Sequence, residues 1–175
     1  MCLALGAPVA SAGMIGNNVS VTTSATGDVT ITPSGAGPAV VVDPGAEFTL
    51  CVGPGDGCGQ AGLFTSVDFK DATIDFQFFG STGGMTGGTF TLVFTGIQDS
   101  IVNVINLGGS LNGGTFDVSA FDTSSITFTG TTGGAFDGTN GPTISFAVTQ
   151  APEPASVFTA ALGLFAVGLS RLRKR

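Results

Sequence analysis

The residues that could do chemistry in this chain are few, and their types limit what it can catalyse. There is no histidine among the 175 residues, so neither a Ser-His-Asp nor a Cys-His arrangement can form. Asp68, Asp71 and Asp75 lie close together in the sequence, and a glycosidase needs two such carboxylates across a cleft. The chain has no Trp and no Tyr to line that cleft. We therefore expect a protein that is not an enzyme.

Two cysteines could form a covalent link. Cys51 and Cys58 flank the Gly- and Pro-rich segment 52–57, which can bring their Cβ atoms together. In an exported protein this pattern predicts a disulfide, with two free thiols as the alternative. The alternation of residue types places Cys51 on the face of Glu47 and Thr49, so we expect the bridge on the outside of a sheet. We expect no zinc site, because the chain has no His and only Cys2 remains as a further sulfur ligand.

Calcium is the one cofactor that the sequence leaves open. Carboxylates, amide oxygens and backbone carbonyls in Gly-rich loops are the hard ligands that this ion prefers. None of the candidates fits an EF-hand loop, and the alternative is that they are solvated side chains in turns. The candidates are Asp56, Asp68, Asp71, Asp137 and Asn140.

Charge is distributed unevenly along the chain. The formal net charge is -7, from 12 acidic and 5 basic residues, and four of the basic residues lie in the last five positions. Between Gly13 and Gln150 the only basic residue is Lys70, against eleven Asp and Glu. This acidic body repels the phosphate backbone, so we expect no nucleic-acid partner.

The segment 13–150, called the body below, alternates repeatedly between apolar and polar residues. Ile74, Phe76 and Phe78 alternate with polar neighbours, and other short runs do the same. Period-2 alternation indicates strands with one dry and one wet face, and the Gly-rich breaks between them are typical of turns. The pattern predicts an all-β domain, an antiparallel β-sandwich or jelly roll. The phenylalanines expected to point inward are Phe48, Phe76, Phe78, Phe90, Phe94, Phe116, Phe128 and Phe146.

Residues 1–12 have features of a secretory signal peptide. They are mostly apolar and end in Ala10-Ser11-Ala12, a small-residue cleavage pattern. The basic start of a signal peptide is absent, so we expect the true coding start to lie upstream. The alternative is an ordinary apolar N-terminal strand. As a signal peptide, this segment would direct the chain to the secretion translocon.

The last 25 residues, 151–175, are called the tail below and have three parts. Pro152-Glu153-Pro154 is held extended, because proline fixes φ and restricts the residue before it. Residues 155–169 are almost entirely apolar, and as a helix to Leu172 this part would span about 27 Å, near the bilayer core of about 30 Å. The basic end should stay in the cytoplasm, which leaves the body outside. This end consists of Arg171, Arg173, Lys174 and Arg175.

These three parts, in this order and at the C-terminus, resemble the PEP-CTERM proteins of Gram-negative bacteria. The resemblance covers about the last 24 residues and implies recognition at Pro152, Glu153 and Pro154 by an exosortase, a membrane transpeptidase that removes the tail. Some family members have an aromatic residue, often Trp, a few positions later, where this chain has Phe158. Family members are typically surface or matrix proteins of bacteria that also secrete exopolysaccharide. The alternative is a plain C-terminal anchor that contains these residues by chance.

Together these features predict an exported structural or adhesive protein with three regions: signal peptide 1–12, β domain 13–150 and sorting tail 151–175. Such a chain would pass through an inner-membrane intermediate and end at the cell surface or in the extracellular matrix. The alternative function is a lectin-like domain that binds polysaccharide, with or without calcium.

Overall fold

The computed structural model describes most of the body. The described residues are 13–27, 29–34, 37–53, 63–82, 87–98, 100–109, 111, 114–132, 136–138 and 142–151. Residues Gly13–Gln150 form one compact unit. Every regular element in the described part of the chain is a β-strand, and all the pairings are antiparallel. The prediction of an all-β antiparallel sandwich is therefore confirmed.

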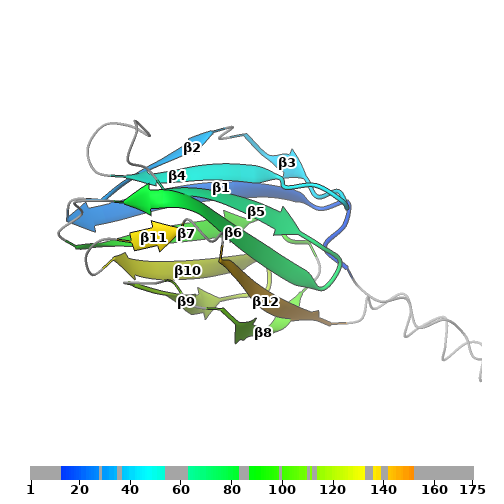
Figure 1. Ribbon diagram of the computed structural model, residues 1–175. Helices are drawn as coiled ribbons and strands as arrows, with labels where there is room; N and C mark the ends of the chain where they lie inside the picture. The colour runs from blue at the N-terminus through cyan, green and yellow to red at the C-terminus, as the bar shows by residue number, and fades with distance from the viewer. Residues whose placement is uncertain are drawn as a thin grey trace, which may run out of the picture. The chain divides into compact units, whose positions relative to one another are not determined.

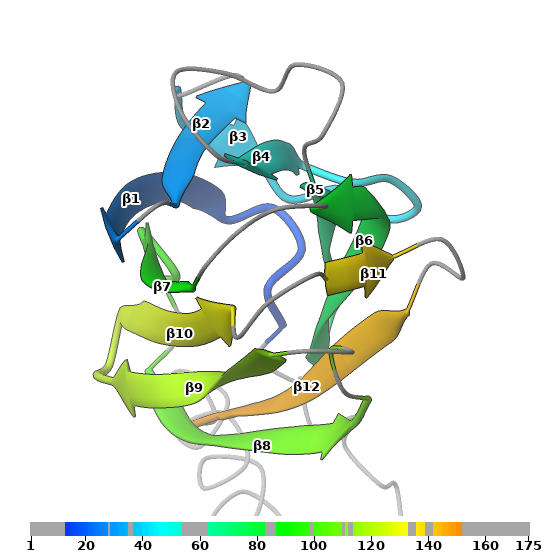
Figure 2. The ribbon, with the colours of Figure 1, turned by 60° about the vertical axis from the view of Figure 1, so that its left-hand side comes forward.

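The strands form two sheets that lie one behind the other (Figure 1). The five-stranded sheet contains, in spatial order, β3 (Ala39–Val40), β1 (Asn18–Gly27), β7 (Gly88–Thr95), β10 (Ser125–Thr132) and β9 (Gly114–Phe121). The seven-stranded sheet contains β2 (Thr30–Ser34), β4 (Phe48–Gly53), β5 (Leu63–Phe69), β6 (Thr73–Thr82), β12 (Thr143–Gln150) and β8 (Ile101–Gly108), and β11 (Phe136–Gly138) pairs with the far end of β6. Neighbours in space are often distant in sequence, as where β7 lies between β1 and β10 (Figure 2).

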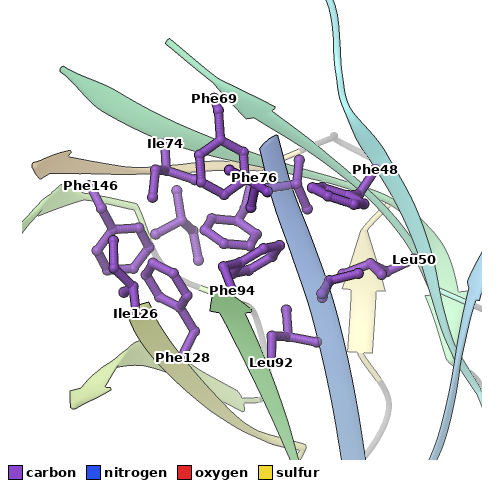
Figure 3. Close-up of a cluster of buried hydrophobic side chains, with 14 of the residues drawn as sticks. Phe48, Leu50, Phe69, Ile74, Phe76, Leu92, Phe94, Ile126, Phe128 and Phe146 are labelled. Carbon is purple, nitrogen blue, oxygen red and sulfur yellow. The ribbon is translucent and has the colours of Figure 1, made fainter. Parts of the chain in front are cut away.

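Phenylalanine rings from both sheets fill the space between the layers (Figure 3). Phe76 on β6 lies against Phe94, Phe128 and Phe146, with ring centroids 6.0, 4.8 and 5.8 Å away. Most of these ring pairs meet edge to face, which is the arrangement that the aromatic quadrupole favours. All eight phenylalanines predicted to point inward are at most 5% exposed, so that prediction is confirmed.

A glycine in the middle of β10 makes room for two of these rings. Gly130 is the cross-strand partner of Phe90 on one side and of Phe116 on the other. Those two rings stack at a centroid distance of 5.8 Å and an interplanar angle of 19°. A Cβ atom at position 130 would lie 2.1 Å from Cζ of Phe90, so any side chain there would displace the ring. The two stacked rings therefore require a glycine at position 130.

Two parts of the sequence prediction lie beyond what the structure describes. The expected signal segment, residues 1–12, and the expected apolar helix of the tail fall outside the described residues. Within the described ranges, no helix is long and apolar enough to cross a bilayer.

Candidate functional sites

The last strand of the body determines where the tail begins. Strand β12 lies between β6 and β8, and Gln150 is the register partner of Ile101 at the start of β8. The N–H of Val148 donates to the carbonyl of Ala72 over a distance of 2.9 Å, which ties this end of β12 to the turn before β6. The chain is therefore held in extended form up to Gln150, and Ala151 follows directly.

Only Ala151 separates the sheet from Pro152. Two residues of extended chain span about 7 Å, so the tripeptide 152–154 begins within that distance of the last sheet residue. The residues predicted to act in sorting, Pro152 to Pro154 and the basic group at 171–175, lie outside the described residues. The structure therefore fixes the point at which the tail leaves the body.

A comparison with protein-family models identifies this segment. The model for the PEP-CTERM protein-sorting motif matches residues 150–174. This chain carries a PEP-CTERM sorting motif. The resemblance seen in the sequence is thus confirmed, and the match begins at the final residue of β12. No curated protein and no solved structure matched the chain.

The PEP-CTERM motif marks a chain for export and for sorting at a membrane by an exosortase. In this chain the folded sheet reaches to within two residues of the motif's Pro-Glu-Pro. An enzyme that acts there must therefore approach the peptide next to the end of β12.

A second candidate site is a polar pocket of about 320 Å³ on the outer face of the seven-stranded sheet. Its lining comes from neighbouring strands and includes Ser66 and Asp68 on β5, Asp75 and Gln77 on β6, and Thr143 on β12. These residues share a face because they follow the period-2 alternation, with the core phenylalanines on the opposite face. None of the described residues that line the pocket is aromatic.

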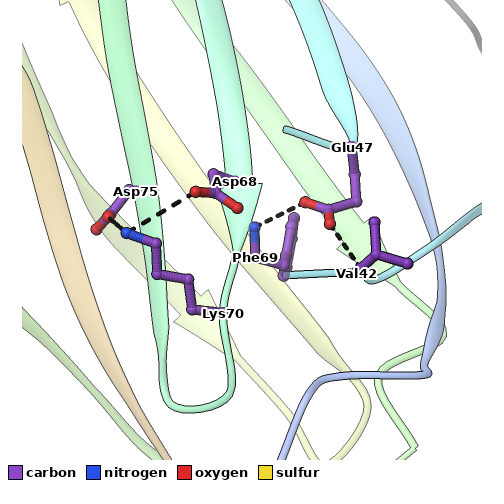
Figure 4. Close-up of polar contacts among 6 residues, drawn as sticks. All are labelled: Val42, Glu47, Asp68, Phe69, Lys70 and Asp75. Carbon is purple, nitrogen blue, oxygen red and sulfur yellow. Dashed lines mark hydrogen bonds and ion pairs between the residues drawn. The ribbon is translucent and has the colours of Figure 1, made fainter. Parts of the chain in front are cut away.

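Three of the residues that line this pocket are charged and contact one another (Figure 4). Asp68 and Asp75 are direct cross-strand partners in the β5–β6 hairpin. Nζ of Lys70 lies between them, 2.5 Å from Oδ2 of Asp75 and 3.8 Å from Oδ2 of Asp68. Two carboxylates facing each other on adjacent strands would repel, and the lysine in the turn offsets that repulsion.

The pKa values follow from these contacts. Burial raises the pKa of Asp68 above its ordinary value, and the charge of Lys70 opposes this only in part. Oδ1 of Asp68 is buried and has no hydrogen-bond partner among the described residues. The hydrogen bond and charge of Asp75 raise the pKa of Lys70. The lysine's contribution to stability is thus present below its ordinary pKa and is lost as the pH rises through the raised value.

Replacing Lys70 by glutamine should lower the free energy of unfolding near neutral pH by up to about 1 kcal/mol, because the two carboxylates then face each other without a cation. The effect is small because Lys70 is partly exposed and solvent screens the pair. It should shrink at a pH of about 2.5, where Asp68, whose pKa is raised by burial, is neutral and the two carboxyl groups no longer repel each other. Urea denaturation at the two pH values measures this. An equal loss at both would mean that packing of the lysine stem, not charge, stabilises the hairpin.

A carboxylate beside this cluster holds the loop before β4 in place. The N–H groups of Val42 and Phe69 donate to the two side-chain oxygens of Glu47, at 2.9 and 2.8 Å. The N–H of Glu47 itself donates to the carbonyl of Val67 at 2.9 Å. Burial raises the pKa of Glu47, although the bonds from Phe69 and Val42 act in the opposite direction. Both side-chain oxygens of Glu47 therefore accept backbone hydrogen bonds that stabilise the loop before β4.

The predicted calcium ligands are only partly described. Asp68 is paired with Lys70, while Asp71 lies in the β5–β6 turn, where a Cβ at Gly13 would collide with its carboxylate. These two residues are thus directed at different neighbours. Asp56 and Asn140 lie outside the described residues, and only the backbone of Asp137 is described, on β11. Among the described residues no group of three acidic, histidine or cysteine side chains could hold a metal ion.

The alternation around Cys51 is as the sequence indicates, since Phe48 and Leu50 are buried in the core and Thr49 is exposed. Cys51 has the same parity as Thr49, yet its side chain is only 5% exposed. Alternation decides on which face a side chain lies, but it does not show what covers that face. Cys58 lies outside the described residues, so the pairing of the two cysteines stays a prediction.

Sequence reasoning missed the way in which Lys70 joins the acidic residues of β5 and β6. It treated Asp68, Asp71 and Asp75 as a run of carboxylates and Lys70 as an isolated base. The signal that could have found the cluster was the hairpin itself, since a turn at 70–72 makes Asp68 and Asp75 cross-strand partners.

Proposed function

We propose that this chain is a non-catalytic protein that is delivered to the cell surface or the extracellular matrix after an exosortase removes its tail. The observation that carries this proposal is the match of the PEP-CTERM motif to residues 150–174, which begins at the final residue of the last strand of the β-sandwich. The order of these two parts suits a body that is released or transferred intact.

The role proposed for the body at that location is structural or adhesive. Its core is packed with phenylalanine rings, and on the outer face Lys70 is paired with Asp75. Nothing observed favours the lectin-like alternative, because none of the described residues of the polar pocket is an aromatic residue on which a sugar could stack.

The test is mass spectrometry of the C-terminus of the protein recovered from a host with the processing enzyme and from one without it. With the enzyme, the C-terminus should lie near Pro152-Glu153-Pro154, and the body should be recovered at the surface or in the matrix. Without it, the chain should end at Arg175 and stay with the membrane fraction. An intact tail in both hosts would contradict the proposal and leave the tail as a plain anchor.

A further inference from the structure

Exposed apolar side chains gather at the end of the body where the tail begins. Such residues are normal on a surface when they are scattered singly, but a group of them marks a contact site. Five of the eight large apolar side chains that are exposed in the described part of the chain lie at this end, and they are called the collar below. The collar consists of Ile15, Val40, Val42, Val102 and Phe121.

Two members of the collar lie beside the last residue of the sheet. Gln150 is the register partner of Ile101, and Val102 is the next residue of β8. The N–H of Ile101 donates to the carbonyl of Thr123 at 3.1 Å, which holds the turn after β9 against the start of β8. Phe121 is the last residue of β9 and leads into that turn. These contacts place both side chains at the end of the body from which the tail leaves.

The other three members reach the same end through the turn between β5 and β6. That turn is bonded to β12, and the N–H of Met14 donates to a carbonyl within it at 3.0 Å, so Ile15 lies next to the turn. The N–H of the residue after Ile15 donates to the carbonyl of Val41 at 2.9 Å, and Val40 and Val42 flank that position. Figure 1 shows β3, this turn and the end of β12 at one end of the body.

The covalent link to the tail brings this end of the body close to a bilayer. Only residues 151–154 separate Gln150 from the apolar segment 155–169, and fully extended they allow at most about 17 Å. An inserted segment of about 27 Å has no length to spare in a core of about 30 Å, so residue 155 must stay near the edge of the core. The headgroup layer occupies about 5–8 Å of the remaining distance. The end of β12 can therefore lie no more than about 12 Å above the headgroups.

We propose that the collar rests in the headgroup layer while the tail is inserted, so that the body stands on the membrane with this end down. The inference rests on the proposed function, because it requires the tail to enter a membrane. Aliphatic and aromatic side chains gain from leaving water for the boundary between headgroups and acyl chains. The tail makes this contact intramolecular, so a group of side chains too small to bind a membrane alone becomes sufficient. Removal of the tail then releases the body.

The charges at this end decide which lipids the collar fits. Asp43 follows Val42 and Asp122 follows Phe121 in the sequence, and both acidic side chains are exposed. Carboxylates repel anionic headgroups, whereas a zwitterionic headgroup has no net charge to oppose them. The collar therefore fits a zwitterionic surface, with apolar contact and not charge as the attraction.

Tryptophan fluorescence of the full chain in phosphatidylcholine vesicles without enzyme tests this contact, because the chain has no Trp of its own. Three single variants are compared: Phe121→Trp in the collar, Phe79→Trp on the outer face of β6, and Phe158→Trp in the tail. Phe79 and Phe121 are both 42% exposed, but Phe79 lies about 20 Å along β6 from its first residue, Thr73. Lipids brominated near the top of their acyl chains quench an indole that reaches the headgroup boundary.

Brominated lipid should lower the fluorescence of the indole at position 121 about twofold, because a collar residue sits at the boundary about 5–10 Å deep. The indole at position 158 should be quenched as well, and the indole at position 79 should change little.

A second set of variants shows whether the apolar side chains cause the contact. Adding Val40→Thr and Val42→Thr to the Phe121→Trp chain removes apolar surface from the collar and should reduce the quenching about twofold. Ile105→Thr and Leu107→Thr provide the matched control, because these side chains are exposed to a similar extent but lie farther along β8. This second pair should leave the quenching unchanged.

The outcomes separate this proposal from the proposed function. Quenching at position 158 but not at 121 would mean that the tail is inserted while the collar stays in water or on a protein partner, which overturns the collar contact alone. Equal quenching at 121 and 79 would mean that the body lies on its side, and quenching at 121 that the Val→Thr pair leaves unchanged would mean that the tether alone holds this end near the bilayer. Either result also overturns it. No quenching at 158 would mean that the tail does not enter the bilayer, which overturns both.

Discussion

Replacing both Pro152 and Pro154 by alanine is expected to leave the chain in the membrane with its tail attached. The apolar segment 155–169 and the basic end are unchanged, so insertion and orientation should persist. Alanine, unlike proline, allows the segment to join a helix, so the extended peptide beside the end of β12 is lost. A misplaced peptide bond at a processing site should slow cleavage by about 100-fold. Immunoblots of membrane and surface fractions would show a slightly larger, membrane-bound species.

A second variant separates recognition from anchoring. Changing Arg171, Arg173, Lys174 and Arg175 to glutamine leaves the Pro-Glu-Pro segment intact but removes the charges that resist transfer across hydrocarbon. That variant should lose its uniform orientation rather than accumulate as a single unprocessed species. Normal processing and localisation of the double proline variant would show that the tripeptide is not the recognised element.

Replacing Phe76 by alanine should reduce the free energy of unfolding of the body by about 3–5 kcal/mol. Its side chain is fully buried and contacts rings of both sheets, among them Phe94 and Phe146. Truncation would leave a cavity between two layers that are held apart by other rings, so the site cannot collapse fully. Chemical denaturation followed by circular dichroism measures the loss.

Phe79 provides the matched control, because it is on the same strand but faces the other way. It is 42% exposed, so Phe79→Ala removes the same atoms from a site already open to water and should cost less than about 1 kcal/mol. Similar losses for the two variants would mean that the layers do not enclose the core as the structure shows.

Much of the fold could be predicted because alternation is a local property. Strand β7, in which Phe90, Leu92 and Phe94 are buried and the residues between them are more exposed, is readable from the sequence alone. The exposure of the segment 101–107 was harder to predict from the sequence. It is apolar almost throughout, and no local pattern showed that it ends a sheet and exposes Ile105 and Leu107.

The candidate sites differ in the same way: one could be predicted from contiguous sequence and the other could not. The sorting motif was readable because its recognition depends on a short contiguous segment whose three parts follow each other. The cluster of Lys70 with Asp68 and Asp75 was not read, because it needs the register of the β5–β6 hairpin.

By itself, the sequence determined that this protein carries a sorting tail and that its body is an all-β domain with inward-facing phenylalanines. Both are local properties: a contiguous motif in the first case and a period of two in the second. Only the tertiary structure decided which strands are neighbours, that Gly130 makes room for the stacked rings of Phe90 and Phe116, and that β8 is the last strand of its sheet. These features depend on contacts between residues far apart in the chain, and alternation carries no information about which distant strand a given face or edge will meet.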